Sequence, residues 1–272
     1  MNDIALGAFN EQARATAAEH SGAFKLLQFD TTSTTNAKAT AVRLLEGLLP
    51  QMRTWGEQKI VVVPRDAVRE MFVVAGEGGP HRKTFLHGQA AETAWQKLQP
   101  LMSIRLRHEV ERDDSVVQIV GCGIPVHGDS LFLLTRTAKD EKAAYGRSTL
   151  WKGCHVEGEV PVTIEGVSDQ VKARVLEEFH LRTTLRLDLL GLAWTEEVGT
   201  ESRHLGVLYQ ARIDDDAVAK SMQDKEFRKA GRGHVLVGKF QTPKDIIKSL
   251  PDLDLEPWSK FAVENLGLQE PS

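Results

Sequence analysis

Apolar residues recur at helical spacing in several stretches of the chain. Between 37 and 53 they fall three or four positions apart, which predicts an amphipathic helix with this apolar stripe: Val42, Leu45, Leu48, Leu49 and Met52. Further helices are expected over 88–98, where Pro100 ends the pattern, and over 216–229 and 255–266.

One further helix is predicted from Asp169 to Leu181. Val171, Val175 and Phe179 are spaced four residues apart and would form its buried stripe. Ser168 is the expected N-cap of this helix.

Runs of β-branched and other apolar residues predict the strands of a sheet, at 59–64, 116–122, 131–135, 205–213 and 234–240. The turn around Gly128 joins the second and third of these strands as a hairpin. Loops are expected over 76–83 and 153–168. Helices and strands mix without strict alternation, which favours a mixed sheet with helices on its faces over a Rossmann or barrel array.

Composition excludes several classes of protein. The 272 residues are 41% hydrophobic and 26% charged, an ordinary globular balance, and the net charge of -4 gives no general attraction for nucleic acid or an anionic membrane. Two cysteines are too few for a disulfide scaffold, and the chain starts without a signal peptide. We expect a cytoplasmic protein without a membrane partner, in which an anionic ligand needs a local basic cluster or a metal ion.

The strongest chemical feature is the segment Gly153-Cys-His-Val-Glu-Gly-Glu159, followed by the helix that carries Glu177 and Glu178. This arrangement resembles the signature of the Nudix hydrolases, a glycine turn and a Glu followed by a helix with paired glutamates. The surroundings of this segment resemble a branch of that superfamily once labelled predicted phosphoesterases. They include the segment from Arg105 to Glu111 and the later Glu256-Pro-Trp-Ser259. The resemblance covers roughly 105–266.

The resemblance implies an α/β fold, a Nudix-like α/β/α sandwich with a mixed sheet. We expect this domain to span 58–272, after an N-terminal helical extension over 1–57 that could pack on the sheet or build a homodimer. The implied activity is hydrolysis of a nucleoside diphosphate-linked or similar small molecule, with Mg²⁺ or Mn²⁺ as cofactor. Clustered carboxylates hold such ions, which neutralise the diphosphate and orient the attacking water.

Site residues follow from the same resemblance. Glu177 and Glu178 would be the catalytic residues and would bind the metal, with Glu159 and the backbone of Gly153. Five residues would bind the substrate: Arg105, Arg136, Arg147, Trp151 and His155. Arg107 also flanks the site, and converging arginines clamp phosphates in a bidentate manner, although four unrelated surface arginines are an equal alternative. A general base could lie among the acidic residues of 196–201.

The sequence departs from the family pattern at the helix itself. Ala173 stands where the family has Arg, and Arg174 where it has the first Glu. Arg174 precedes Glu177 by three residues and Glu178 by four, so it can reach both carboxylates and neutralise them. A catalytically impaired nucleotide-binding or sensor module is therefore the alternative function, and a protein-interaction scaffold is a third. Without a Cys-x-x-Cys motif or paired histidine spacing, the sequence does not predict a zinc site.

Overall fold

The computed structural model describes residues 56–266 apart from 77–78, 83–84, 138–147, 197–199 and 229–234. The predicted helix over 37–53 lies outside these residues, as does the predicted extension except for Gly56 and Glu57. Within the described part, the predicted strands and helices all occur, and several of their bounds differ.

A mixed sheet forms the centre of the molecule around one long strand, β6 (Val116–His127). The strand β10 (His204–Arg212) runs parallel along one edge of β6. The other edge pairs in turn with three antiparallel strands: β1 (Lys59–Pro64), β8 (Lys152–His155) and β7 (Ser130–Thr137). The sheet continues through β9 (Arg186–Ala193), β4 (Phe85–His87), β5 (Ser103–Leu106), β12 (Val235–Gln241) and β11 (Glu226–Arg228).

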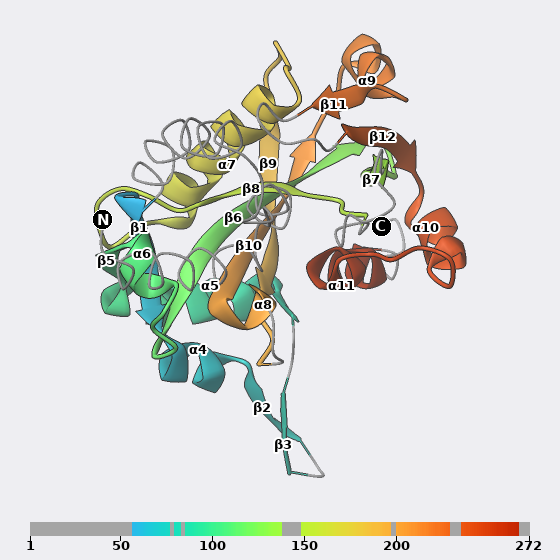
Figure 1. The fold of residues 1–272 in the computed structure, drawn as a ribbon. Helices are drawn as coiled ribbons and strands as arrows, with labels where there is room; N and C mark the ends of the chain where they lie inside the picture. Colours follow the sequence, from blue (N-terminus) through green and yellow to red (C-terminus); the bar gives the residue numbers. More distant parts are fainter. Residues whose placement is uncertain are drawn as a thin grey trace, which may run out of the picture.

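Helices cover both faces of this sheet (Figure 1). One face packs against α7 (Ile164–Glu178), α5 (Gly88–Leu98) and α4 (Arg65–Met71), whose apolar residues share one buried cluster. The other face packs against α11 (Pro257–Leu266) and α10 (Pro243–Ser249). The shorter elements are α6 (Arg107–Val110), α8 (Thr200–Arg203), α9 (Asp216–Met222), a 3₁₀ turn (Gln99–Leu101) and a projecting hairpin of β2 (Val73–Gly76) and β3 (Gly79–Arg82). This architecture confirms the predicted α/β/α sandwich.

Alternation along β6 separates the two halves of the core. Ile119 belongs to the cluster under α7, whereas Val120 and Cys122 belong to the cluster under α11. Successive side chains of a strand point to opposite faces, so each strand that crosses the middle of the sheet contributes to both. The same alternation places consecutive residues of β8 on opposite faces.

The helix α7 begins earlier than the sequence predicts. Its N-cap is Thr163, whose hydroxyl accepts a hydrogen bond from the backbone N–H of Gly166, and Ser168 lies inside the helix. The prediction of Ser168 as N-cap was wrong because the four-residue apolar spacing continues upstream to Val167, which is fully buried. The helix ends at Glu178, and His180 has a φ of 53°, the left-handed conformation that follows many helix ends.

Other bounds differ for related reasons. The segment predicted as a loop over 153–168 contains β8 and the first turn of α7, and the predicted loop over 76–83 contains β3. The predicted helix over 216–229 ends at Met222 and gives way to β11. The sequence also missed β9, where leucines with good helix propensity form a strand because they pair with β10 and β4.

Candidate functional site

Two glycines of β6 allow α7 to lie close to the sheet. A Cβ at Gly121 would lie 2.4 Å from Cγ2 of Val171, and a Cβ at Gly123 would lie 2.5 Å from Cγ2 of Val175. A Cβ at Gly153 would lie 2.5 Å from the carbonyl oxygen of Gly121. Glycine at these positions therefore brings β6, β8 and α7 together, and the C-terminal end of α7 lies over β8.

Hydrogen bonds fix both the helix and the loop that precedes it. The hydroxyl of Tyr209 on β10 donates to the carbonyl oxygen of Ile164 at 2.8 Å. The Gln170 side chain accepts from the backbone N–H of Glu157 at 2.9 Å and donates to its carbonyl at 2.8 Å. The loop after β8 is thus tied to the helix that it leads into.

Four charged side chains meet where α7 passes over β8, and we call them the α7 ion cluster: Lys152, Arg174, Glu177 and Glu178. The Arg174 guanidinium donates to Glu177 at 2.9 Å and also pairs with Glu178. The Lys152 ammonium lies 3.6 Å from the other oxygen of Glu178. The side chain of Glu178 is 13% exposed and that of Glu177 is 71% exposed. The half-buried carboxylate is therefore held between two cations that belong to the chain.

The donor set around α7 does not fit a divalent cation as it is arranged. Among the residues that the structure describes, no three His, Cys, Asp or Glu side chains lie close enough to share a metal ion, so exposed Glu159 does not complete a set with Glu177 and Glu178. Burial raises the pKa of the Cys154 thiol to about 11, so this neighbour of Arg174 stays protonated at neutral pH. Assignment of Gly153, Glu159, Glu177 and Glu178 to metal stays a prediction.

The predicted substrate-binding residues do not converge on the α7 ion cluster where the structure describes their side chains. Arg105 lies on β5 and pairs with Asp113 and, at 3.9 Å, with Glu109. Trp151 lies on the α11 side, where its indole N–H donates to Glu256 at 2.6 Å and its ring packs against Trp258. The backbone of Arg136 lies on β7, and Arg147 is outside the described residues.

His155 is the last residue of β8 and lies on the face opposite α7. Its Nε2 atom is 3.3 Å from Nε2 of His204, the first residue of β10. Burial, the nearby Arg107 guanidinium and His204 hold the pKa of His155 well below its ordinary value, so the ring is neutral at neutral pH. Sequence spacing does not reveal this pair, because the two histidines are 49 residues apart.

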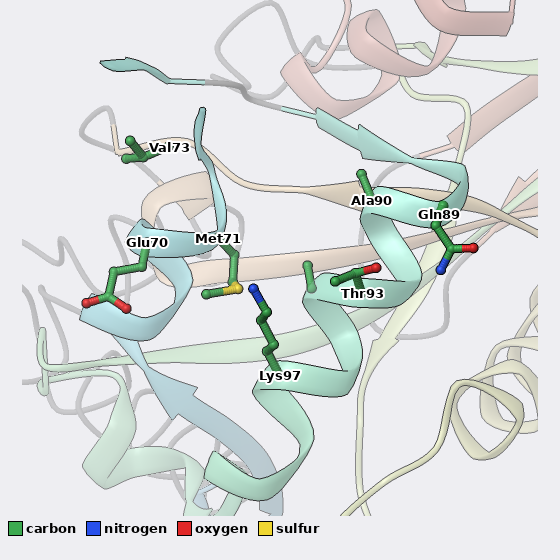
Figure 2. Close-up of a pocket in the computed structure, with 8 residues that line it drawn as sticks. Glu70, Met71, Val73, Gln89, Ala90, Thr93 and Lys97 are labelled. Carbon is green, nitrogen blue, oxygen red and sulfur yellow. The ribbon is translucent and has the colours of Figure 1, made fainter. Parts of the chain in front are cut away.

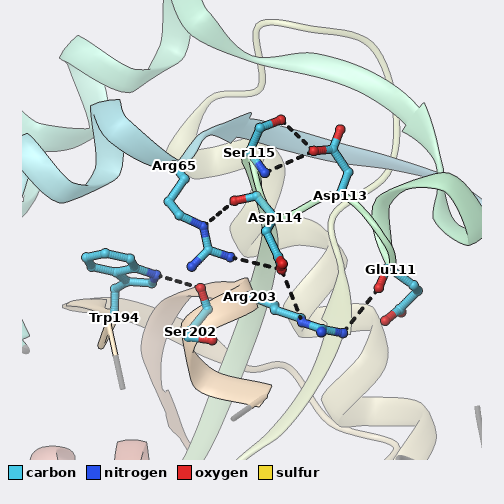
Figure 3. A network of polar contacts seen from close by, with 8 residues as sticks. All are labelled: Arg65, Glu111, Asp113, Asp114, Ser115, Trp194, Ser202 and Arg203. Carbon is cyan, nitrogen blue, oxygen red and sulfur yellow. Dashed lines mark hydrogen bonds and ion pairs between the residues drawn. The ribbon is translucent and has the colours of Figure 1, made fainter. Parts of the chain in front are cut away.

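A network of hydrogen bonds and ion pairs stabilises the turn between α6 and β6 (Figure 3). Arg65 donates from Nε to the carbonyl of Asp114, and the Nε atom of Arg203 lies 3.8 Å from the carboxylate of Asp114. Arg203 also donates to the carbonyl of Glu111 at 3.2 Å. Arg203 precedes His204, so this network helps to fix where β10 begins.

Two other candidate features lie elsewhere. Among the possible general bases, Glu196 pairs with Arg69, whereas residue 197 and the side chain of Glu201 are not described. A shallow pocket of about 320 Å³ lies between α4 and α5 (Figure 2) and is lined by Glu70, Met71, Val73, Gln89, Ala90, Thr93, Ala94 and Lys97. None of the predicted site residues lines this pocket.

Comparison with known proteins identifies the fold. No family model matches the sequence, and no curated protein matches it. The solved structure of Tm1382, provisionally described as a Nudix hydrolase, superposes with a TM-score of 0.54 over 78% of this chain and 100% of that chain. The described chain has a Nudix fold. At 20% sequence identity, this likeness shows the fold alone.

A second Nudix structure is less similar than Tm1382. A MutT Nudix hydrolase from Burkholderia pseudomallei has a TM-score of 0.37 and 17% identity, over 54% of this chain and 96% of that chain. This value is too low to carry an argument about this protein. No helix of the described Nudix-fold residues is long and apolar enough to cross a membrane.

Proposed function

We propose that this protein binds a nucleotide-like diphosphate at the α7 ion cluster without a metal ion and without hydrolysing it. The observation that carries this proposal is the position of Glu178, whose two oxygens face Arg174 and Lys152. Positive charge from the chain itself lies where the resemblance to Nudix hydrolases places the metal ion. The Nudix fold supports the choice of ligand class.

Charge balance explains why a metal ion is disfavoured in this arrangement. Mg²⁺ needs oxygen ligands in nearly ideal octahedral geometry. To reach both Glu177 and Glu178 it would have to displace the guanidinium of Arg174, which contacts each of them. The ion would then lie close to two cations, and no third carboxylate of the described residues would compensate for their charge.

A diphosphate, in contrast, would compete with the glutamates for cations that are already in place. Arg174 and Lys152 are partly exposed, at 28% and 18%, so an anion can approach them. Guanidinium groups bind phosphate oxygens in a bidentate manner. The contact with Glu177 would yield first, because exposed ion pairs contribute at most about 1 kcal/mol.

One substitution separates binding from hydrolysis, because the two functions predict opposite results for Glu178→Gln. If the site binds an anion, removal of the competing carboxylate should raise the affinity for nucleoside diphosphates and nucleoside diphosphate sugars. We expect about a two- to fivefold gain, which corresponds to the ~1 kcal/mol or less of a partly exposed ion pair. Calorimetry in EDTA would measure this affinity, and Lys152→Met should lower it.

Glu165→Gln is the matched control, since Glu165 is an exposed acid in the first turn of the same helix. The affinity of this variant for nucleoside diphosphates should equal that of the native protein. Phosphate or nucleoside monophosphate should not appear when Mg²⁺ or Mn²⁺ is added to the native protein. An affinity that falls in Glu178→Gln would contradict the proposal.

Metal-dependent hydrolysis of the diphosphate is the second candidate, and the exposure of Glu177 favours it. A carboxylate that is 71% exposed can reorient toward an incoming ion when Arg174 moves away. Product that requires Mg²⁺ or Mn²⁺ and is lost in Glu178→Gln would establish this function. If none of the nucleoside diphosphates and nucleoside diphosphate sugars is bound or hydrolysed, the result would favour the protein-interaction scaffold.

A further inference from the structure

The rings of His155 and His204 meet above the middle of the sheet. Their centroids are 5.4 Å apart, the ring planes are inclined by 61°, and the two Nε2 atoms face each other at 3.3 Å. In a pair without a bound ion, one Nε2 atom must donate to the other. A separation of 3.3 Å is slightly beyond the usual range for an N–H donor.

The topology of the sheet creates this pair. β8 and β10 flank β6, with His155 opposite Val120 and His204 opposite Gln118. Residues paired in register share one face of a sheet, and Val120 lies on the α11 face. Both imidazoles therefore project on the side away from α7, over neighbouring positions of β6.

A third polar side chain lies at the same place. Gln118 is 1% exposed, and its amide oxygen Oε1 has no hydrogen-bond partner. A buried acceptor without a partner is unfavourable unless a ligand satisfies it. The register pairs Gln118 of β6 with His204 of β10, so the two side chains start from neighbouring positions on the same face of the sheet.

We propose that His155, His204 and Gln118 form a binding site for a first-row transition-metal ion such as Zn²⁺, with water as the remaining ligand. Zn–N bonds of about 2.0–2.1 Å at a tetrahedral angle place two ligand nitrogens roughly 3.3–3.4 Å apart. The observed Nε2–Nε2 separation of 3.3 Å matches this spacing. The amide oxygen of Gln118 would supply the third ligand.

The electrostatics of this site agree with a modest affinity. Neutral imidazole is the form that binds metals, and the lowered pKa of His155 keeps this ring neutral at neutral pH. His155 is partly exposed, so a hydrated ion can reach it. Arg107 lies nearby and opposes a cation, but Glu111 compensates for part of its charge at 3.3 Å. We expect a dissociation constant in the micromolar range.

This site is independent of the proposed function. It lies on the other face of the sheet from the α7 ion cluster, and its two nitrogen ligands suit Zn²⁺ or Co²⁺ rather than Mg²⁺. Loss of one site should leave the other intact. The predicted absence of a zinc site rested on sequence spacing, which does not detect ligands that strands bring together.

Titration of the native protein with Co²⁺ tests the proposal, because Co²⁺ reports its coordination through visible absorption. We expect one equivalent to bind, Zn²⁺ to displace it, and Mg²⁺ to have no effect. His155→Asn and His204→Asn should each weaken binding at least tenfold, and Gln118→Leu should weaken it less. His87→Asn is the control, since His87 is exposed and lies outside the cluster. Circular dichroism would establish that each variant folds.

X-ray absorption on the Co²⁺-loaded native protein gives a measurement that needs no variant. Two imidazole nitrogens in the first coordination shell are expected. No uptake of Co²⁺ or Zn²⁺ by the folded native protein would overturn the proposal. Uptake that survives His204→Asn, or a first shell without imidazole, would overturn it as well.

Discussion

The two faces of β8 satisfy polar side chains in different ways. On the α7 face, Lys152 meets a carboxylate that also pairs with Arg174, so formal charges neutralise one another. On the opposite face, His155 meets His204, and Glu256 receives hydrogen bonds from Trp151 and Ser259. Neutral donors and rings are the partners of these two side chains. The charged side chains on the α7 face are partly exposed and can exchange partners readily. The side chains on the opposite face are more buried and are held in one arrangement.

The largest effect is expected when α7 is pushed away from the sheet. In Gly121→Ala, the new Cβ would lie 2.4 Å from Cγ2 of Val171 and 3.1 Å from Cγ1 of Val167. Overpacking of this kind should lower the free energy of unfolding by about 1–3 kcal/mol. Urea denaturation would measure the loss.

Gly166→Ala is the control for that substitution. Gly166 lies in α7, where a Cβ would approach Thr163 and Val162 no closer than 3.5 Å. The change should be neutral or stabilising by up to ~1 kcal/mol, since alanine favours the helix. A loss of stability as large as that of Gly121→Ala would mean that helix propensity and packing do not account for how α7 is held.

A second substitution tests whether Arg174 alone disfavours a metal ion at the α7 ion cluster. Arg174→Glu would remove the guanidinium and place a third carboxylate on the face of Glu177 and Glu178, since these positions are three and four residues apart. We expect the affinity for Mn²⁺ to rise at least tenfold, about 1.4 kcal/mol, because three carboxylates would share an ion. Electron paramagnetic resonance of free Mn²⁺ would report binding.

Arg182→Glu makes the same change of charge at an exposed position outside the cluster and should leave Mn²⁺ binding unchanged. If Arg174→Glu gained no affinity over this control, the geometry of α7 itself would be unsuited to metal. This result would argue against metal-dependent hydrolysis and in favour of diphosphate binding without a metal ion.

The contrast between the faces explains what the sequence could and could not predict. The contacts of Arg174 with Glu177 and Glu178 followed from their spacing on one helix, and the structure contains both. The contribution of Lys152 could not be predicted, because it depends on where β8 pairs with β6. The two histidines meet only through the register of three strands, and sequence separation hides such a contact.

The fold was easier to predict than the site for a related reason. Continuous apolar runs identified β6 and β10, and helical spacing of apolar residues identified α7, because all three elements are buried in the core. It missed β8, whose Gly-Cys-His sequence has little strand propensity and is extended only because β6 pairs with it. Lys152 of the candidate site lies on that strand, so an error of a few residues in local structure concealed its contact with Glu178.

A smaller effect is expected from the hydrogen bond that ties α7 to β10. Tyr209 belongs to β10, the strand of His204, and its hydroxyl donates to Ile164 in the first turn of α7. Tyr209→Phe should lower the free energy of unfolding by about 1 kcal/mol, the usual contribution of one hydrogen bond. Amide hydrogen exchange should accelerate in the first turn of α7 while β10 stays protected. Unchanged exchange in that turn would mean that the Thr163 cap alone holds it.

The smallest effect is a change in pH dependence on the face of neutral donors. Burial raises the pKa of Glu256 above its ordinary value, although hydrogen bonds from Trp151, Ser259 and Trp258 partly oppose it. A carboxyl group with a raised pKa favours folding when protonated. Its contribution is therefore complete below its unfolded pKa of about 4.3 and is lost as the pH rises through the folded pKa.

Glu256→Gln should remove this pH dependence, because an amide does not titrate. The stability of the native protein relative to the variant should thus increase as the pH falls from neutral toward 4.5, which urea denaturation at several pH values would measure. A difference that does not vary with pH would show that the hydrogen bonds from Trp151 and Ser259 hold the carboxylate as well as water does. The two faces of the sheet would then be equally able to hold a negative charge.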